Sequence, residues 1–118
     1  MQKNRFLYIL AGGFIGSALR EIFIQNYAGP SGTLIVNVLG CFVLGYLMYA
    51  TELGFFSDKE RYLVGTGFCG GLTTFSTFMV QTMQLPGAFA LGNIFANIFF
   101  CLVSVFLGRA AALKGLGT

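Results

Sequence analysis

Four long apolar stretches, joined by short links that carry proline, glycine or charge, run through this 118-residue chain. A helix needs about 20 apolar residues to cross the hydrocarbon of a bilayer, so the length allows about four crossings and little else. Hydrophobic residues make up 56% of the chain and charged residues 9%, which is too apolar for a soluble domain of this size. The sequence therefore predicts one all-α, multi-pass membrane domain over residues 1–118.

The links between the stretches set the predicted span limits. Pro30 and Pro86 are placed to start helices, because proline is tolerated in a first turn and disfavours helix before it. Ser57 and Glu60 have the spacing of a capping box. The N-terminal stretch has no small-residue cleavage site and simply continues, so we interpret it as a span and not as a signal peptide. The predicted spans are Phe6 to Ala28, Ser31 to Leu53, Glu60 to Leu85 and Gly87 to Gly108.

The third span contains the string Gly70-Gly-Leu-Thr-Thr-Phe-Ser-Thr-Phe78. Glycine and threonine weaken a helix and release its backbone amides and carbonyls, which a membrane tolerates only against protein or a water-filled cavity. We therefore predict that the third helix is broken near Gly70 to Phe78. Breaks of this kind often form an ion or substrate site, since the two half-helices point opposite dipole ends at it.

Polar residues inside the spans have two interpretations. We single out Asn37, Thr73, Thr74, Ser76, Thr77, Asn93 and Asn97. Asn93 and Asn97 are four residues apart, as are Thr73 and Thr77, so each pair predicts a stripe on one helix face. The stripes either line a narrow polar track or hold neighbouring helices together by hydrogen bonds. The glycines at 12, 13, 16, 67 and 71 include two G-x-x-x-G spacings, which predict close helix packing.

Few residues are available for catalysis or metal binding. The chain has no histidine, and its three cysteines, Cys41, Cys69 and Cys101, stand singly in different spans, so we expect small buried thiols and no zinc site. The four acids are Glu21, Glu52, Asp58 and Glu60, and no lysine lies inside a span. An enzyme and a nucleic-acid partner are not expected. A proton-coupled dual-topology exporter would need a deep carboxylate, which is missing, and a non-conducting scaffold is the other alternative.

Three strings resemble the small fluoride channels, Fluc or CrcB. They are Gly12-Gly-Phe-Ile-Gly-Ser-Ala-Leu-Arg20, Gly32-Thr-Leu-Ile-Val-Asn37-Val-Leu-Gly40 and Gly67-Phe-Cys-Gly-Gly-Leu-Thr-Thr-Phe-Ser-Thr-Phe78. The resemblance implies an antiparallel, dual-topology dimer of four-helix subunits in a bacterial or archaeal cytoplasmic membrane. It also implies two fluoride pores, a central structural sodium ion, and passive export of toxic fluoride.

The resemblance also implies roles for single residues. Phe75, Phe78 and Asn37 resemble the pore residues of the family, Ser76 and Thr77 join the polar track, and Arg20 resembles an arginine near the aqueous vestibule. Gly70 and Thr73 resemble positions whose backbone carbonyls hold the sodium. Asn93 and Asn97 stand where the family often has Tyr and Ser, and Glu21 stands where it often has an aromatic residue. The two amides still supply hydrogen-bond donors for an anion.

The basic residues are unevenly distributed over the predicted topology. Six of the seven, Lys3, Arg5, Lys59, Arg61, Arg109 and Lys114, fall on the side of the termini and the middle link, and Arg20 alone falls on the other. The positive-inside rule then places both termini in the cytoplasm. A chain that inserts in both orientations should be less biased. The sequence therefore leaves two partners open, a second copy or a related chain of opposite orientation.

Overall fold

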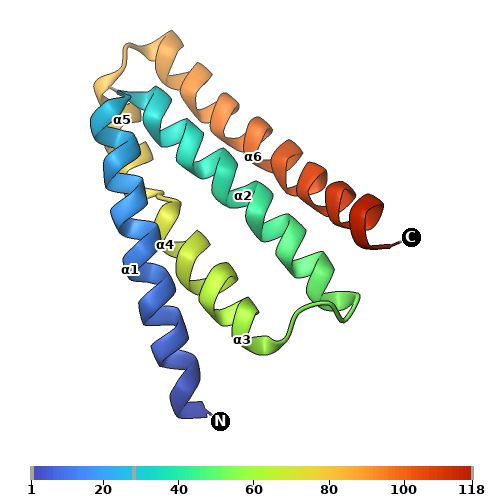
Figure 1. Ribbon diagram of the computed structural model, residues 1–118. Helices are drawn as coiled ribbons and strands as arrows, with labels where there is room; N and C mark the ends of the chain where they lie inside the picture. The colour runs from blue at the N-terminus through green and yellow to red at the C-terminus, as the bar shows by residue number, and fades with distance from the viewer. Residues whose placement is uncertain (1, 28, 118) are drawn as a thin grey trace.

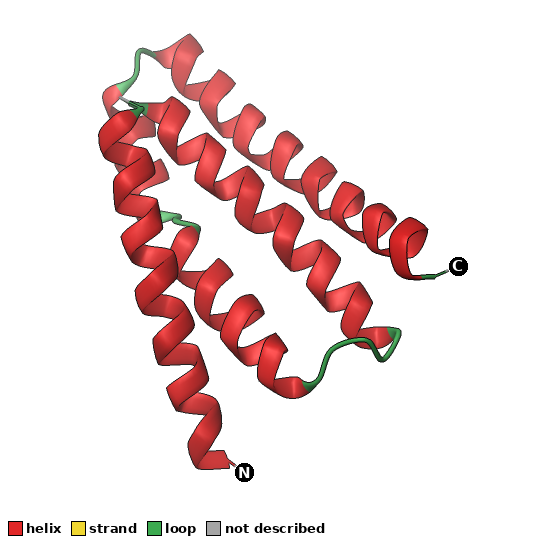
Figure 2. Cartoon of the chain, in the orientation of Figure 1, coloured by secondary structure: helices red, strands yellow, loops and turns green. Residues whose placement is uncertain are grey.

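The computed structural model describes residues 2–27 and 29–117, and within them every regular element is a helix (Figure 2). In chain order these are α1 (Gln2–Asn26), α2 (Pro30–Glu52), α3 (Asp58–Glu60), η1 (Arg61–Cys69), α4 (Gly70–Leu72), α5 (Ser76–Gln84) and α6 (Gly87–Leu116). The third predicted span is thus divided among α3, the π-helix η1, α4 and α5. The π-helical winding of η1 was not expected from the sequence.

Within the part of the chain that the structure describes, four segments are long and apolar enough to cross a membrane, as predicted, and the chain is a multi-pass membrane protein. Their limits differ from the prediction at the two ends of the chain. The first helix begins at Gln2, before the predicted start at Phe6, and ends at Asn26; the predicted limit at Ala28 lies outside the described residues. The last helix continues past Gly108 to Leu116, because the alanines at 110–112 are strong helix formers.

The predicted joints are present. Gly29 has φ of 74°, a conformation that glycine adopts without a Cβ clash, and Pro30 is the first residue of α2. Before α3, the Ser57 backbone N–H donates to the Glu60 carboxylate at 2.9 Å, and the Ser57 hydroxyl donates to the same oxygen. The capping box predicted from these two residues is confirmed.

The helices pack around α2 (Figure 1). One side of α2 carries α6, its most extensive partner, and η1 also contacts α2. The first helix packs mainly on η1 and α4 and therefore lies on the far side of the bundle from α6. In Figure 1 the N-terminus lies at the bottom, the link between Glu52 and Asp58 at the lower right and the C-terminus at the right. All three lie away from the upper end, where α1 passes to α2 and α5 passes to α6, as four successive crossings require.

Glycines allow two backbone-to-backbone contacts between helices. A Cβ on Gly12 would collide with the backbone oxygen of Leu63, and a Cβ on Gly67 would lie 2.7 Å from the oxygen of Ile9, so the packing predicted for the G-x-x-x-G spacings is confirmed between α1 and η1. A second contact joins α2 to α6, where a Cβ on Gly45 would meet the backbone oxygen of Val105. The contact at Gly45 was not predicted from the sequence.

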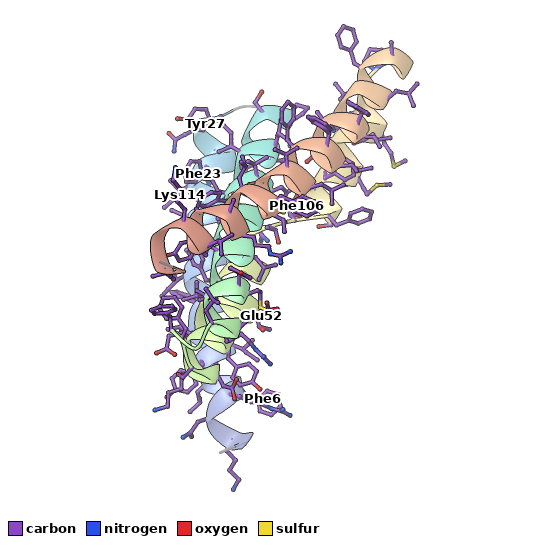
Figure 3. All side chains as sticks on the ribbon, turned by 90° about the vertical axis from the view of Figure 1, so that its right-hand side faces the viewer. Phe6, Phe23, Tyr27, Glu52, Phe106 and Lys114 are labelled. Carbon is purple, nitrogen blue, oxygen red and sulfur yellow. The ribbon has the colours of Figure 1, made fainter. Side chains whose placement is uncertain are left out.

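The outer surface of the bundle is apolar. Large hydrophobic side chains project outward from every long helix, and Phe6 on α1 and Phe106 on α6 are 62% and 65% exposed (Figure 3). The buried core is correspondingly small. Such a surface suits a lipid bilayer, which solvates apolar side chains as well as a protein interior does.

Candidate functional site at the break in the third span

The third span is broken where the sequence predicted. The helix ends at Leu72, Thr73 is extended with φ of −80° and ψ of 154°, and helix resumes at Ser76. Glycines at 70 and 71 weaken the preceding turn. The Thr73 hydroxyl donates to the Cys69 carbonyl at 2.9 Å, and this local bond to the backbone competes with continued helix.

The amide of Asn37, on α2, holds the broken segment. Its Oδ1 accepts from the Thr74 backbone N–H at 2.8 Å, and its Nδ2 donates to the Thr74 carbonyl at 3.1 Å. One side chain therefore pairs with both backbone groups of Thr74, as a neighbouring strand would. Asn37 is only 9% exposed, and a buried backbone group without a partner would be costly.

These side-chain bonds draw donors away from two backbone carbonyls. In a continuous helix the Thr74 N–H would donate to the Gly70 carbonyl, and the Thr77 N–H to that of Thr73. Here the Thr74 N–H donates to Asn37, and the Thr77 N–H donates to the Thr74 hydroxyl at 3.2 Å. The carbonyl oxygens of Gly70 and Thr73 thereby lose their helical donors.

The two phenylalanines form a tilted pair at the start of α5. Their ring centroids are 5.7 Å apart, with an interplanar angle of 50°. Phe78 is buried, whereas Phe75 is 72% exposed and lies at the surface of the subunit. The Ser76 hydroxyl is also exposed and lies 3.4 Å from that of Thr74. The pair thus has one ring in the bundle and one available to a neighbour.

One predicted stripe is present and the other is not. On α6, Asn97 Nδ2 donates to the backbone carbonyl of Asn93 at 2.9 Å and to its Oδ1 at 3.2 Å. The amides of these two residues therefore do lie on one face. Thr73 and Thr77 do not form a helical stripe, because the extended backbone at Thr73 separates them. That prediction was wrong, since it assumed an unbroken helix through the break.

Thr82, which lies beyond the string from Gly70 to Phe78, also belongs to the site. Thr82 accepts from Asn93 Nδ2 at 2.8 Å and donates to the Phe78 carbonyl at 2.7 Å. Thr82 was not predicted from the sequence, although a hydroxyl within a membrane span and four residues after Phe78 was a usable signal. Asn37 joins the same group, because its Nδ2 lies 3.3 Å from Asn97 Oδ1.

Arg20 lies beside the end of the first half-helix. Its Nη1 donates to the Gly71 carbonyl at 2.9 Å, so a positive charge faces the carbonyl end of α4. The neighbouring Glu21 is exposed and accepts from Gln25 at 3.3 Å. The Glu21 carboxylate is thus hydrogen-bonded on the surface of α1, while the Arg20 guanidinium points toward the break.

A groove of about 650 Å³ runs along α2, η1 and α6. Gly70, Thr73 and Asn37 line part of it. Its wall also includes all three cysteines, Cys41, Cys69 and Cys101, which the sequence placed in separate spans. They are free thiols, and no cluster of three metal-ligating side chains occurs within residues 2–27 and 29–117.

Comparisons with known proteins cover nearly all of the chain. A sequence model of the family described as CrcB-like protein, camphor resistance (CrcB), matches residues 7–115. The fluoride-specific ion channel FluC 2 of Methanosarcina acetivorans is 50% identical over 116 residues, covering 98% of this chain and 91% of that protein. The FluC of Methanococcus aeolicus is 41% identical, covering 93% and 96%. The FluC 1 of Methanospirillum hungatei is 42% identical, covering 88% and 75%.

Proposed function

Because the chain belongs to the CrcB-like protein family, we propose that it is a fluoride channel that lets fluoride leave the cell passively. The observation that carries this proposal is the break at 73–75, held by Asn37 in a span that otherwise crosses the membrane as helix. Relatives named as fluoride-specific channels align over the whole of this region. The protein is accordingly a channel and not an enzyme.

The chemistry of the break suits a small anion. Fluoride holds its water tightly, so a pore must supply hydrogen-bond donors in exchange, and the hydroxyls of Ser76 and Thr77 are donors. The Asn37 amide, which bonds to Thr74 and Asn97, holds in place the segment that carries them. The rings of Phe75 and Phe78 add positive edges, since an aromatic quadrupole is negative only on its faces. Asn93 and Asn97 extend the polar surface along α6. Arg20 attracts the anion toward the vestibule without standing in the narrow route.

A structural sodium ion fits the two carbonyls that lack helical donors. Sodium prefers oxygen ligands, and the Gly70 and Thr73 carbonyls are neutral oxygens at the negative end of α4. Both residues line the groove. An ion bound there by two subunits would sit between them and join them.

The groove and the exposed Phe75 ring support a dimer. We propose that two subunits meet in opposite orientations across the groove, which completes two pores at the interface. The clustered basic residues favour a fixed orientation with cytoplasmic termini. The partner is then a second copy or a related chain of opposite orientation. Expressing this chain alone distinguishes these two kinds of partner, because a stable antiparallel homodimer that conducts fluoride excludes an obligate second chain.

Fluoride efflux from liposomes tests the main proposal. Purified protein is reconstituted into vesicles loaded with potassium fluoride, and a fluoride electrode follows release after valinomycin is added. We expect rapid fluoride efflux, and almost no chloride efflux from matched vesicles loaded with potassium chloride. A folded dimer that releases no fluoride would overturn the proposal. A proton-coupled exporter is disfavoured because the carboxylate of Glu21 is exposed on α1 and the other three acids lie at or between the ends of α2 and α3.

A further inference from the structure

Hydrogen bonds connect the break to α5 through three asparagines in an unbroken series. The Thr74 N–H donates to Asn37 Oδ1 at 2.8 Å, and Asn37 Nδ2 donates to Asn97 Oδ1 at 3.3 Å. Asn97 Nδ2 then donates to Asn93 Oδ1 at 3.2 Å. The series continues from Asn93 Nδ2 to the Thr82 hydroxyl and ends on the Phe78 carbonyl. We call Asn37, Asn97, Asn93 and Thr82 the amide ladder.

Both ends of the amide ladder fix its direction. A backbone N–H can only donate, so Asn37 must present its oxygen to Thr74 and its nitrogen to the next amide. A backbone carbonyl can only accept, so Thr82 must donate to Phe78 and accept from Asn93. Each amide between them therefore has one orientation that satisfies both neighbours. Reversing any amide would set two like groups against each other.

Burial makes these bonds strong and mutually dependent. Asn37, Asn97 and Thr82 are 9%, 7% and 7% exposed. Hydrogen bonds in such surroundings polarise one another, and an unpaired member is costly. The ladder also links three separate elements, because its members come from α2, α6 and α5. Removing one hydrogen bond of the ladder should therefore weaken the others.

The amide ladder is hydrogen-bonded to the backbone at both ends of the segment that carries the Phe75 and Phe78 rings. Asn37 holds Thr74, the residue just before Phe75, and Thr82 holds the carbonyl of Phe78. The geometry assigns Asn97, Asn93 and Thr82 as positioning residues. They act on the anion route by orienting the Asn37 amide and the first turn of α5, without binding fluoride themselves. This assignment rests on the proposed channel function.

The competing explanation is simple packing between helices, and Ser104 offers a matched control. Its hydroxyl donates to the Val38 carbonyl at 2.7 Å and joins α6 to α2, and Ser104 is 4% exposed. It thus resembles Thr82 in burial and in bond length, yet it lies outside the ladder. A packing role predicts the same effect at both positions.

Fluoride and chloride efflux from liposomes are measured for Thr82→Val, Thr82→Ser and Ser104→Ala beside the parent. We expect Thr82→Val to slow fluoride efflux about tenfold and to lower the fluoride-to-chloride ratio, because one severed rung weakens the hold of Asn93 and Asn97 on the Asn37 amide. Thr82→Ser keeps the hydroxyl and should return the rate to within about threefold of the parent. Ser104→Ala should stay within about twofold.

A double-mutant cycle tests whether the ladder acts as one unit. In the background of Asn97→Ala, adding Thr82→Val should cost less than about twofold, whereas the two changes would multiply if each only removed packing. If Thr82→Val does not fold, Asn93→Ala replaces it in the same cycle. Equal effects of Thr82→Val and Ser104→Ala, no recovery in Thr82→Ser, or multiplying effects in the cycle would overturn the assignment while the parent conducts. A parent that does not conduct would instead refute the channel function.

Discussion

The side chain of Asn37 replaces helical hydrogen bonds that the break removes. Its amide matches the N–H and C=O of Thr74 in both position and polarity, which a carboxylate or an apolar side chain cannot do. The sequence predicted that Asn37 is part of the site. It could not predict the pairing with Thr74, because the two residues are 37 positions apart along the chain.

Asn37→Ala should lower the free energy of unfolding by about 2 to 3 kcal/mol, since it leaves two half-buried backbone groups of Thr74 without partners. Thermal unfolding in detergent micelles, followed by circular dichroism, measures the loss. Asn26→Ala is the control, because the Asn26 amide is exposed and bonds only to its own helix at the Ile22 carbonyl. Equal melting temperatures for the two variants would show that Asn37 does not hold the break.

Phe75→Leu should slow fluoride efflux about tenfold while leaving the melting temperature of the subunit nearly unchanged. The ring of Phe75 is 72% exposed, so little subunit packing is lost, but its positive edge is removed from the proposed route. Fluoride efflux and thermal unfolding are compared with Phe89→Leu, a ring on α6 that is 70% exposed. If fluoride efflux is equally fast in the two variants, Phe75 is not part of the pore.

Helix contacts in this bundle are set by glycine at the points of closest approach. The first helix meets η1 backbone to backbone, and α6 meets α2 in the same way. The G-x-x-x-G spacings predicted the first of these contacts. The second was not predicted because Gly45 and Gly108 lie in different spans and form no spacing with each other, although each faces the partner helix.

Gly12→Ala should destabilise the fold by about 1 to 3 kcal/mol, because its Cβ would collide with the Leu63 carbonyl and force α1 away from η1. Gly92→Ala is the matched control. It is a helical glycine on α6 whose added Cβ would meet no described atom within 4 Å beyond its chain neighbours and its own helix backbone, and alanine there should stabilise by about 0.5 to 1 kcal/mol. Thermal unfolding of both proteins checks the opposite signs. A neutral Gly12→Ala would contradict the close contact.

The isolated subunit leaves much of its surface for other molecules to cover. Its outer faces are apolar, its groove exposes the Gly70 and Thr73 segment, and one ring of the aromatic pair faces outward. Lipid can cover the outer faces, but a groove with backbone carbonyls needs a polar partner or an ion. These features favour an assembly in which a second subunit and a cation fill the groove.

Replacing sodium with potassium at constant ionic strength should lower the melting temperature of the proposed dimer and increase its dissociation. An ion that binds only the assembled state stabilises it by about 2.7 kcal/mol at one hundred times its dissociation constant. Thermal unfolding and size-exclusion chromatography in the two salts measure both effects. Identical results in sodium and potassium would argue against a sodium site at Gly70 and Thr73.

Local chemistry explains why much of this protein could be predicted from its residues. Apolar length sets the number of spans, proline and serine set their starts, and glycine with threonine breaks the third helix before Phe75. Each of these effects acts within a few residues of its cause. The prediction of a helical Thr73 to Thr77 stripe was wrong because it carried helical periodicity across that same break.

The amide ladder could not be predicted, because hydrogen bonding between distant residues depends on how the spans pack. The register of α6 on α2 brings Asn97 to Asn37. The packing of α5 on α6 brings the Thr82 hydroxyl to Asn93. The same packing gathers three separate cysteines into one groove. The residues specify which polar groups enter the membrane. Which of them meet, and which carbonyls are left without donors, follows from the three-dimensional arrangement of the helices.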